Sequence, residues 1–200
     1  MNYYVNLYDL KSRLGISVTT YDSLLEAMMD AASRYVEELA RRKFYSWRAS
    51  LYFDTGAETD FLLLPEDLLS VTSLAADSEL DATYDGEAWA ENTDYMLYPA
   101  NGYPKARIRT MSTGSYALPA NQVRYLKITG VWGFGNGFSA HPWRTTAITA
   151  TLASAAATTI TLSAGSVVHR GHTILVEDEQ ILVETEPVTA GGSTTATVQR

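Results

Sequence analysis

The sequence predicts an α+β fold, in which one short and one long N-terminal helix pack on an antiparallel β-sheet and a small C-terminal β module follows. Two observations predict it. Apolar residues recur three or four positions apart up to about residue 43, and alternate with a period of two from Ser46 onwards. Helical and strand patterns are also segregated along the chain, which disfavours a parallel sheet built from βαβ units.

Two helices are expected before residue 45. Asn6 is a good N-cap for a short helix over about residues 7–14, and Gly15 is a suitable C-terminal stop. A longer helix follows Thr19 or Thr20. Asp22 and Glu26 come early in it and the basic residues Arg41, Arg42 and Lys43 come late, which complements the helix dipole. Its apolar residues fall on one stripe that must be covered by something: Leu24, Leu25, Met28, Ala31, Ala32, Tyr35, Val36 and Leu39.

Strands are expected where the apolar period is two. The first is SWRASLYFD, and the next two, FLLLP and LLSVTSLAAD, are separated at Pro65. After a polar excursion, SELDATYDGEAWAENT, the strands DYMLYP, KARIRTM and QVRYLKITGVWG complete the sheet, with a turn at Asn101-Gly102 between the first two.

Composition predicts where the domains divide. We expect an α+β domain over residues 1–144, an Ala/Thr-rich linker over 145–158 and a small β module over 159–200. TILV and QILVE, on either side of residues 177–179, indicate a hairpin in that module. The sequence ends in TTATVQR, which reads as a strand, so we expect the natural domain to continue past Arg200.

Bulk composition excludes several classes of function. The formal net charge of −8 disfavours a groove that grips nucleic-acid phosphates. The absence of cysteine excludes disulfides, thiolate zinc sites and a cysteine nucleophile. No apolar run approaches the roughly 20 residues of a membrane span, and the N-terminus lacks the pattern of a signal peptide. The sequence has thirteen tyrosines, whose apolar rings and polar hydroxyls suit partly solvent-exposed surfaces such as interfaces.

No motif in the chain predicts catalysis or a cofactor. The run GFGNG lacks the spacing of a dinucleotide fingerprint and Pro142 blocks a following helix, so we interpret its glycines as a bend at a strand end. His141, His169 and His172 are interpreted as polar loop residues, since metal sites draw three or four convergent ligands. The acidic run at 177–179 lacks the alternating ligands of a calcium loop. No nucleophile elbow occurs, so we expect no enzyme and no catalytic, metal or cofactor residues.

Several segments, taken in order, resemble the head-tail connector family of tailed double-stranded-DNA bacteriophages, also called head-completion or adaptor proteins. They are LYDLKSRLGI, AASRYVEELARRKF, LYFD, FLLLP with LLSVTSL, DYMLYPANGYP and LKITGVWGFG before a proline. The similarity covers about residues 3–143, and its most specific parts are Leu-Gly-Ile, Ala-Ala-Ser and Thr-Gly-x-Trp-Gly. The C-terminal β hairpin departs from familiar members, which often continue into a helix or short tail.

The resemblance implies a structural protein of the virion neck, made in the host bacterial cytoplasm. Its copies would form a homo-oligomeric ring, commonly a dodecamer, that binds the portal protein on one side and a tail-side stopper or completion protein on the other. Genomic DNA would pass through the channel without sequence-specific binding, and no cofactor or membrane is implied.

Two groups of residues are candidates for these contacts. The aromatic residues around the glycine-rich exit, Trp132, Phe134, Phe138 and Trp143, are candidates for the assembly interface, with packing against the end of the sheet as the alternative. Arg41, Arg42 and Lys43 are candidates for touching DNA in the channel, with a helix C-terminal cap as the alternative.

Two other classes of function stay open at this point. A carbohydrate-binding or adhesion module would use tyrosines and tryptophans as stacking platforms. A hydrolase would depend on the sparse histidines.

Overall fold

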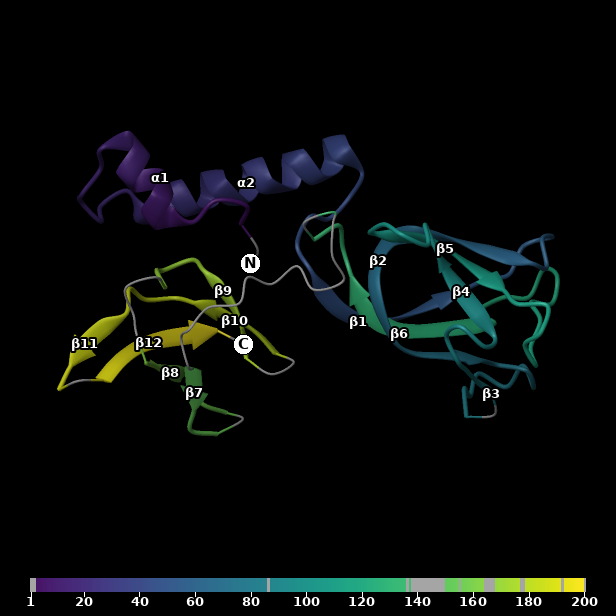
Figure 1. The fold of residues 1–200 in the computed structure, drawn as a ribbon. Helices are drawn as coiled ribbons and strands as arrows, with labels where there is room; N and C mark the ends of the chain where they lie inside the picture. The colour runs from purple at the N-terminus through teal and green to yellow at the C-terminus, as the bar shows by residue number, and fades with distance from the viewer. Residues whose placement is uncertain are drawn as a thin grey trace. The chain divides into compact units, whose positions relative to one another are not determined.

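The computed structural model describes residues 3–85, 87–135, 137, 150–154, 156–163, 168–176, 179–191 and 193–199. These residues form two helices followed by antiparallel strands (Figure 1), which confirms the expected α+β class. No helix in the described part of the chain is long and apolar enough to cross a membrane.

The chain divides into two compact units. One, the helix–sheet unit, joins Met1–Ala40 to Trp143–Arg200; the other, the central unit, is Arg41–Pro142. The end of the central unit lies close to the boundary expected after residue 144. The helices, however, belong to the same unit as the C-terminal strands, whereas the sequence analysis grouped them with the central strands.

Both helices form, and the caps of the first are those expected. In α1 (Leu7–Leu14), the Asn6 side chain accepts a 2.7 Å hydrogen bond from the Asp9 backbone N–H, and Gly15 ends the helix with a φ of 69°. The second helix, α2 (Asp22–Ala40), is shorter than expected. Arg41 follows it with a left-handed φ of 50°, so the prediction that the three basic residues lie in its last turn is wrong.

The central unit is one six-stranded antiparallel sheet. Its strands are β1 (Trp47–Phe53), β2 (Phe61–Ala76), β3 (Glu87–Trp89), β4 (Tyr95–Tyr98), β5 (Lys105–Thr110) and β6 (Leu126–Trp132). The order is β1-β6-β2-β5-β4, with β3 pairing β2. β3 lies inside the stretch that was expected to be a polar excursion.

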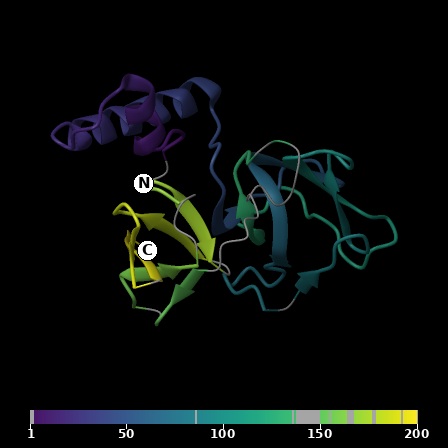
Figure 2. The same ribbon diagram turned by 60° about the vertical axis from the view of Figure 1, so that its left-hand side comes forward.

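β2 is a single 16-residue strand, although the sequence predicted two strands separated at Pro65. The proline lies where β2 changes partners, because residues up to Leu63 pair with β5 and pairing with β6 begins at Leu68. The missing proline N–H therefore breaks no ladder hydrogen bond, and the register shift at this point allows the strand to bend. The curvature of β2 is visible in both ribbon views (Figures 1 and 2).

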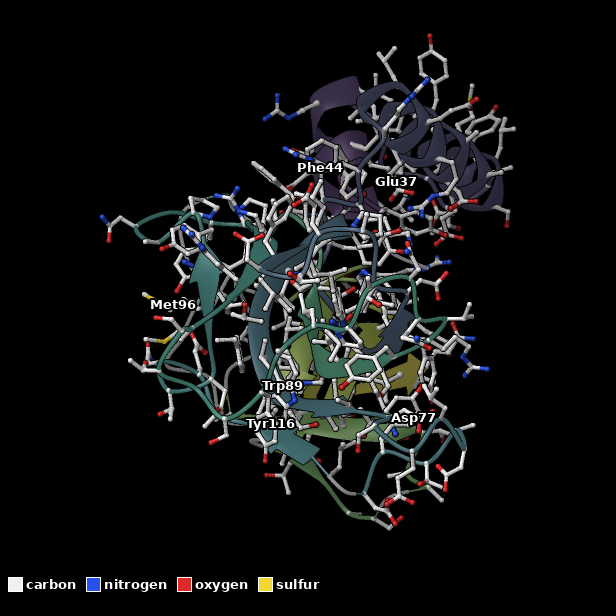
Figure 3. All side chains as sticks on the ribbon, turned by 90° about the vertical axis from the view of Figure 1, so that its right-hand side faces the viewer. Glu37, Phe44, Asp77, Trp89, Met96 and Tyr116 are labelled. Carbon is white, nitrogen blue, oxygen red and sulfur yellow. The ribbon has the colours of Figure 1, made fainter. Side chains whose placement is uncertain are left out.

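The core of the central unit comes from the inward residues of these strands. Strict alternation in β6 buries Leu126, Ile128 and Trp132 completely. Gly130 continues the same inward row. A Cβ at that position would lie 2.2 Å from the Ser70 carbonyl oxygen, so the close approach of β6 to β2 requires glycine here. Beside this core, Trp89 and Tyr116 stack with their ring centroids 5.5 Å apart (Figure 3).

The C-terminal strands form a second six-stranded antiparallel sheet. They are β7 (Ala150–Leu152), β8 (Thr159–Leu162), β9 (Thr173–Val176), β10 (Glu179–Val183), β11 (Val188–Ala190) and β12 (Ser193–Gln199). The order is β7-β8-β12-β10-β9, with β11 pairing β12. The expected hairpin is confirmed by the pairing of β9 with β10, and the expected final strand by β12. β7 lies wholly within the segment 145–158 that was expected to be a linker.

Candidate functional site

Phe134 of the aromatic candidates meets Arg42 and Lys43 of the basic candidates in one place in the central unit. The Phe134 backbone N–H donates a 2.8 Å hydrogen bond to the Lys43 carbonyl oxygen, and the Phe134 ring lies edge-on to Phe44 with centroids 5.7 Å apart. The Arg42 guanidinium carbon lies 4.6 Å from the Phe134 ring centroid, and the Lys43 ammonium lies 4.5 Å from that of Trp47. The segment after α2 and the exit of β6 thus form one cluster of aromatic and basic side chains.

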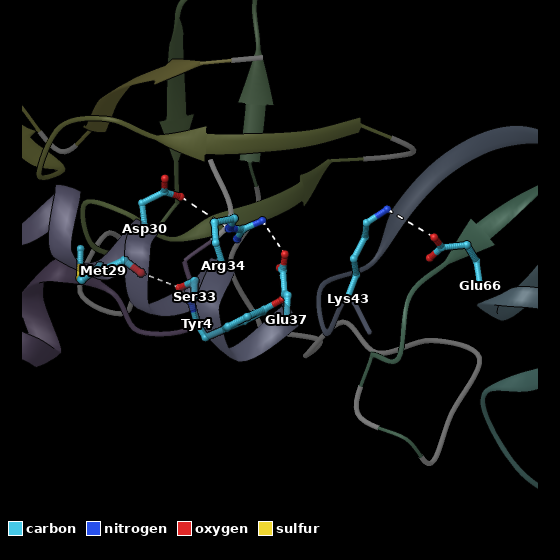
Figure 4. Close-up of polar contacts among 8 residues, drawn as sticks. All are labelled: Tyr4, Met29, Asp30, Ser33, Arg34, Glu37, Lys43 and Glu66. Carbon is cyan, nitrogen blue, oxygen red and sulfur yellow. Dashed lines mark hydrogen bonds and ion pairs between the residues drawn. The ribbon is translucent and has the colours of Figure 1, made fainter. Parts of the chain in front are cut away.

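Acidic residues of β2 already pair with two of these basic groups. Arg42 Nε lies 2.9 Å from Asp67 Oδ2, and Lys43 Nζ lies 3.7 Å from Glu66 Oε1 (Figure 4). Desolvation raises the pKa of Asp67, the Arg42 charge lowers it, and the Glu66 charge raises it. Pairing reduces the positive field that Arg42 and Lys43 offer to a phosphate. A DNA contact by Arg41, Arg42 and Lys43 stays a prediction.

Trp132 is not an interface residue. It is 0 % exposed, its indole Nε1–H donates a 3.0 Å hydrogen bond to the Ala49 carbonyl oxygen, and it stacks on Phe53. The alternative, packing against the sheet, therefore holds for this residue, because alternation in β6 directs it inwards. Phe134 is half-buried in the cluster described above. Phe138 and Trp143 lie outside the described residues.

The surface with the clearest functional character is the exposed apolar face of α2. Leu24, Met28, Ala31, Tyr35 and Leu39 are all exposed, and the exposed fraction of Leu39 reaches 75 %. Their spacing of three or four residues places them in one row along the helix. We call these five residues the α2 stripe. The sequence predicted the stripe and a cover for it, and the described residues of the helix–sheet unit leave the stripe exposed.

The opposite face of α2, with buried Asp22, Met29 and Ser33, is the one that packs inside the helix–sheet unit. Ser33 is buried, accepts a hydrogen bond from the Tyr4 backbone N–H and donates one of 2.7 Å to the Met29 carbonyl oxygen (Figure 4). Asp22 is also buried and lies 2.6 Å from Lys11 Nζ. A soluble helix normally buries its apolar face, so the exposure of the α2 stripe within this unit is unusual.

The segment 168–172 holds the helices on the C-terminal sheet. Arg170 reaches Glu26 at 2.7 Å and Asp22 at 3.4 Å. The His169 ring stacks on Tyr8 of α1, with centroids 3.9 Å apart, and its Nδ1 lies 2.5 Å from a carboxylate oxygen of Glu186. The sequence analysis interpreted this segment as a polar loop; no spacing in the sequence links it to acids 148 residues away.

His172 makes this packing sensitive to pH. Its Nδ1 accepts a 3.2 Å hydrogen bond from the His169 backbone N–H, so the neutral ring is the form that fits. Burial lowers the pKa of His172 and so does the nearby His169, whereas Asp9 and Glu186 raise it. A lowered folded-state pKa means that the unfolded chain binds more protons below pH 6.5, so stability rises with pH through the window below that value.

We therefore expect the helix–sheet unit to be less stable at about pH 5 than at about pH 7.5. Hydrogen exchange of the β9 and β10 amides, corrected for intrinsic rates, measures this. In His172→Asn the amide oxygen keeps the acceptor without the titration, so the pH dependence should decrease. An unchanged pH dependence in this variant would contradict the assignment to His172.

The described residues contain no group of three or more His, Asp or Glu side chains that could hold a metal ion. Comparisons of the chain with known protein families, with curated proteins and with solved structures found no match.

Proposed function

We propose that this protein is a structural head-tail connector subunit of a tailed bacteriophage. In this proposal its copies form a ring beneath the portal, extend the DNA channel and present a surface to the tail, with no catalytic step. The observation that carries the proposal is the α2 stripe, an apolar helix face that the described residues of its own unit leave exposed. The choice of this family rests on the resemblance of the ordered sequence segments described above.

The energetics favour covering this stripe with another chain. Burying a large apolar side chain contributes about 1.5–3 kcal/mol, and Leu24, Met28, Tyr35 and Leu39 each expose more than half of their surface. Association costs translational and rotational freedom, so only part of that sum would remain as affinity. Four such anchors in one row still resemble the hot-spot core of an interface more than an ordinary protein surface.

The charge distribution fits a channel wall better than a DNA-gripping groove. The chain carries a formal charge of −8, and two of its three clustered basic residues pair with Asp67 and Glu66. A surface that repels phosphates allows DNA to pass without sticking.

The test is assembly with the portal protein of the same phage. We expect negative-stain electron microscopy of the mixture to show a ring of this protein on the portal. The double variant Leu24→Glu/Leu39→Glu should lose the ring, because burying two carboxylates in an apolar contact costs several kcal/mol. Circular dichroism of the free variant would check that the fold is kept.

Leu80→Glu is the matched control. Leu80 is an exposed leucine of the central unit and is not part of the α2 stripe, so its charged variant should assemble as the parent does. Rings that form equally well with the stripe variant, or a parent chain that never binds the portal, would overturn the proposal.

A further inference from the structure

A second exposed surface, on the outer side of the central sheet, mixes arginines with apolar side chains in a regular pattern. Register places Leu63, Arg107 and Tyr98 side by side across β2, β5 and β4. The adjacent row is formed in the same way by Phe61, Arg109 and Met96. We call these six residues the arginine face.

Alternation along the three strands separates this face from the core. Leu62 and Leu64 of β2, Ile108 of β5 and Leu97 of β4 are buried, whereas their neighbours in sequence point to the other side. Leu63, Arg107 and Arg109 are exposed, and Met96 projects outwards from the sheet (Figure 3). Exposed Leu63 thus lies beside Arg107 and close to the Phe61 ring, so apolar and charged groups are contiguous on this face.

The arginines are held in position but keep their charge available. The Arg107 guanidinium lies between two rings, 5.7 Å from the centroid of Phe61 and 5.3 Å from that of Tyr98. Arg109 makes a loose ion pair of 3.8 Å with Asp60, in which both side chains are more than half exposed. Contacts this exposed contribute little stability, so these cations remain available to an acidic partner.

The face is also hollowed on one side. A cleft of about 600 Å³ is bordered by Asp60, Met96, Tyr98, Arg109 and Tyr116, among others. A large apolar or aromatic side chain of a partner could be seated there, as anchors are at interface cores. Arginine, tyrosine, phenylalanine and methionine are also the residue types enriched at such cores.

We propose that the arginine face binds the α2 stripe of a second copy of this chain. The inference rests on the proposed function, and it names the surface that would cover the stripe. A closed ring requires a heterologous contact, in which two different patches of the same chain meet. The stripe and the arginine face are two such patches.

The α2 stripe and the arginine face are complementary in charge and in apolar character. Of the five acidic residues of α2, exposed Glu38 borders the stripe, three residues after Tyr35. The other four already form ion pairs within the chain: Asp22, Glu26, Asp30 and Glu37. The arginine face places two cations among four apolar side chains. Leucine, methionine and tyrosine of the stripe would meet phenylalanine, leucine and tyrosine of the face, with Glu38 towards Arg107 or Arg109. A nucleic acid fits this face less well, because the whole chain is strongly acidic.

The absence of cysteine makes the contact testable by disulfide trapping. The double variant Leu39→Cys/Leu63→Cys has one thiol on each patch. At high protein concentration under mild oxidation, we expect it to form a ladder of cross-linked oligomers on a non-reducing gel. The matched control is Leu39→Cys/Val123→Cys, because Val123 is 73 % exposed on the same unit but lies outside the face. We expect at least tenfold less oligomer from the control.

Charge reversal tests the role of the arginines within the same assay. Adding Arg107→Glu and Arg109→Glu to the trapping variant should reduce the ladder at least tenfold. Adding Glu38→Lys to that chain should restore part of it. Loss without any restoration would contradict a direct pairing of Glu38 with the face.

The outcomes separate this inference from the proposed function. A single Leu39→Cys variant that cross-links to itself would show that two stripes meet, which overturns the inference and leaves assembly through the stripe intact. A disulfide within one chain, or equal trapping at Val123, would overturn the inference too. Absence of every cross-link, together with normal ring formation by the stripe variants, would overturn both.

Discussion

Trp132→Ala is expected to lower the free energy of unfolding of the central unit by about 3–5 kcal/mol, the range for removing a large aromatic side chain from a core. Trp132 is fully buried and stacks on Phe53, so the variant leaves a cavity between β6 and β1. It also leaves the Ala49 carbonyl oxygen without its indole donor. Chemical denaturation followed by near-UV circular dichroism measures the loss.

Two further variants make the result specific. Trp132→Phe keeps a ring against Phe53 and should cost less than the alanine variant. Val123→Ala, at an exposed position of the same unit, should change the free energy of unfolding by no more than about 0.5 kcal/mol. If Trp132→Ala left stability unchanged and instead blocked ring formation, Trp132 would be an interface residue after all.

The parts of the fold that the sequence predicted are those encoded locally. Asn6 and Gly15 bound α1 because a side-chain acceptor and a left-handed glycine satisfy backbone groups within one turn. The hairpin of β9 and β10 and the alternation in β6 follow equally from neighbouring residues. In each case the pattern needs no knowledge of distant contacts.

The parts it did not predict depend on distant partners. Pro65 reads as a strand break, yet β2 continues through it because the pairing partner changes at that point. The helices were grouped with the central strands because they precede them in sequence. Arg170 pairs with Glu26 across most of the chain length, and such contacts leave no periodic pattern.

In the candidate site, too, local patterns were predictable from the sequence and features that depend on distant contacts were not. Periodicity was sufficient to place Leu24, Met28 and Leu39 on one stripe, but it could not show that the opposite face of α2 is the buried one. That orientation depends on the ion pairs of Asp22 and on buried Ser33. The arginine face was missed, although Arg107 and Arg109, two positions apart in a predicted strand, must lie on the same side of a sheet.

Gly133→Ala is expected to cost the central unit more than about 3 kcal/mol, because two effects combine. Gly133 has a φ of 109°, which an alanine adopts only with strain. A Cβ at this position would also lie 2.0 Å from the Tyr45 carbonyl oxygen, so the backbone before β1 would have to move. Gly133 N–H donates a 2.7 Å hydrogen bond to Asp67 O, and such a shift would disturb this bond as well.

Two other glycines distinguish the strain of a positive φ from the steric clash of an added Cβ. Gly191 has a positive φ of 59° but open space around its Cα, so Gly191→Ala should cost about 1–2 kcal/mol through the backbone alone. Gly56 has neither constraint, and Gly56→Ala should be neutral or stabilising by up to about 1 kcal/mol. Thermal denaturation of the three variants measures the order of their losses of stability.

The close approach of Gly133 to Tyr45 joins the exit of β6 to the segment that carries Arg42 and Lys43. Gly133→Ala should therefore also displace the Phe134 ring from Arg42. An alanine variant as stable as the Gly56 control would refute the view that this glycine run is a structural bend.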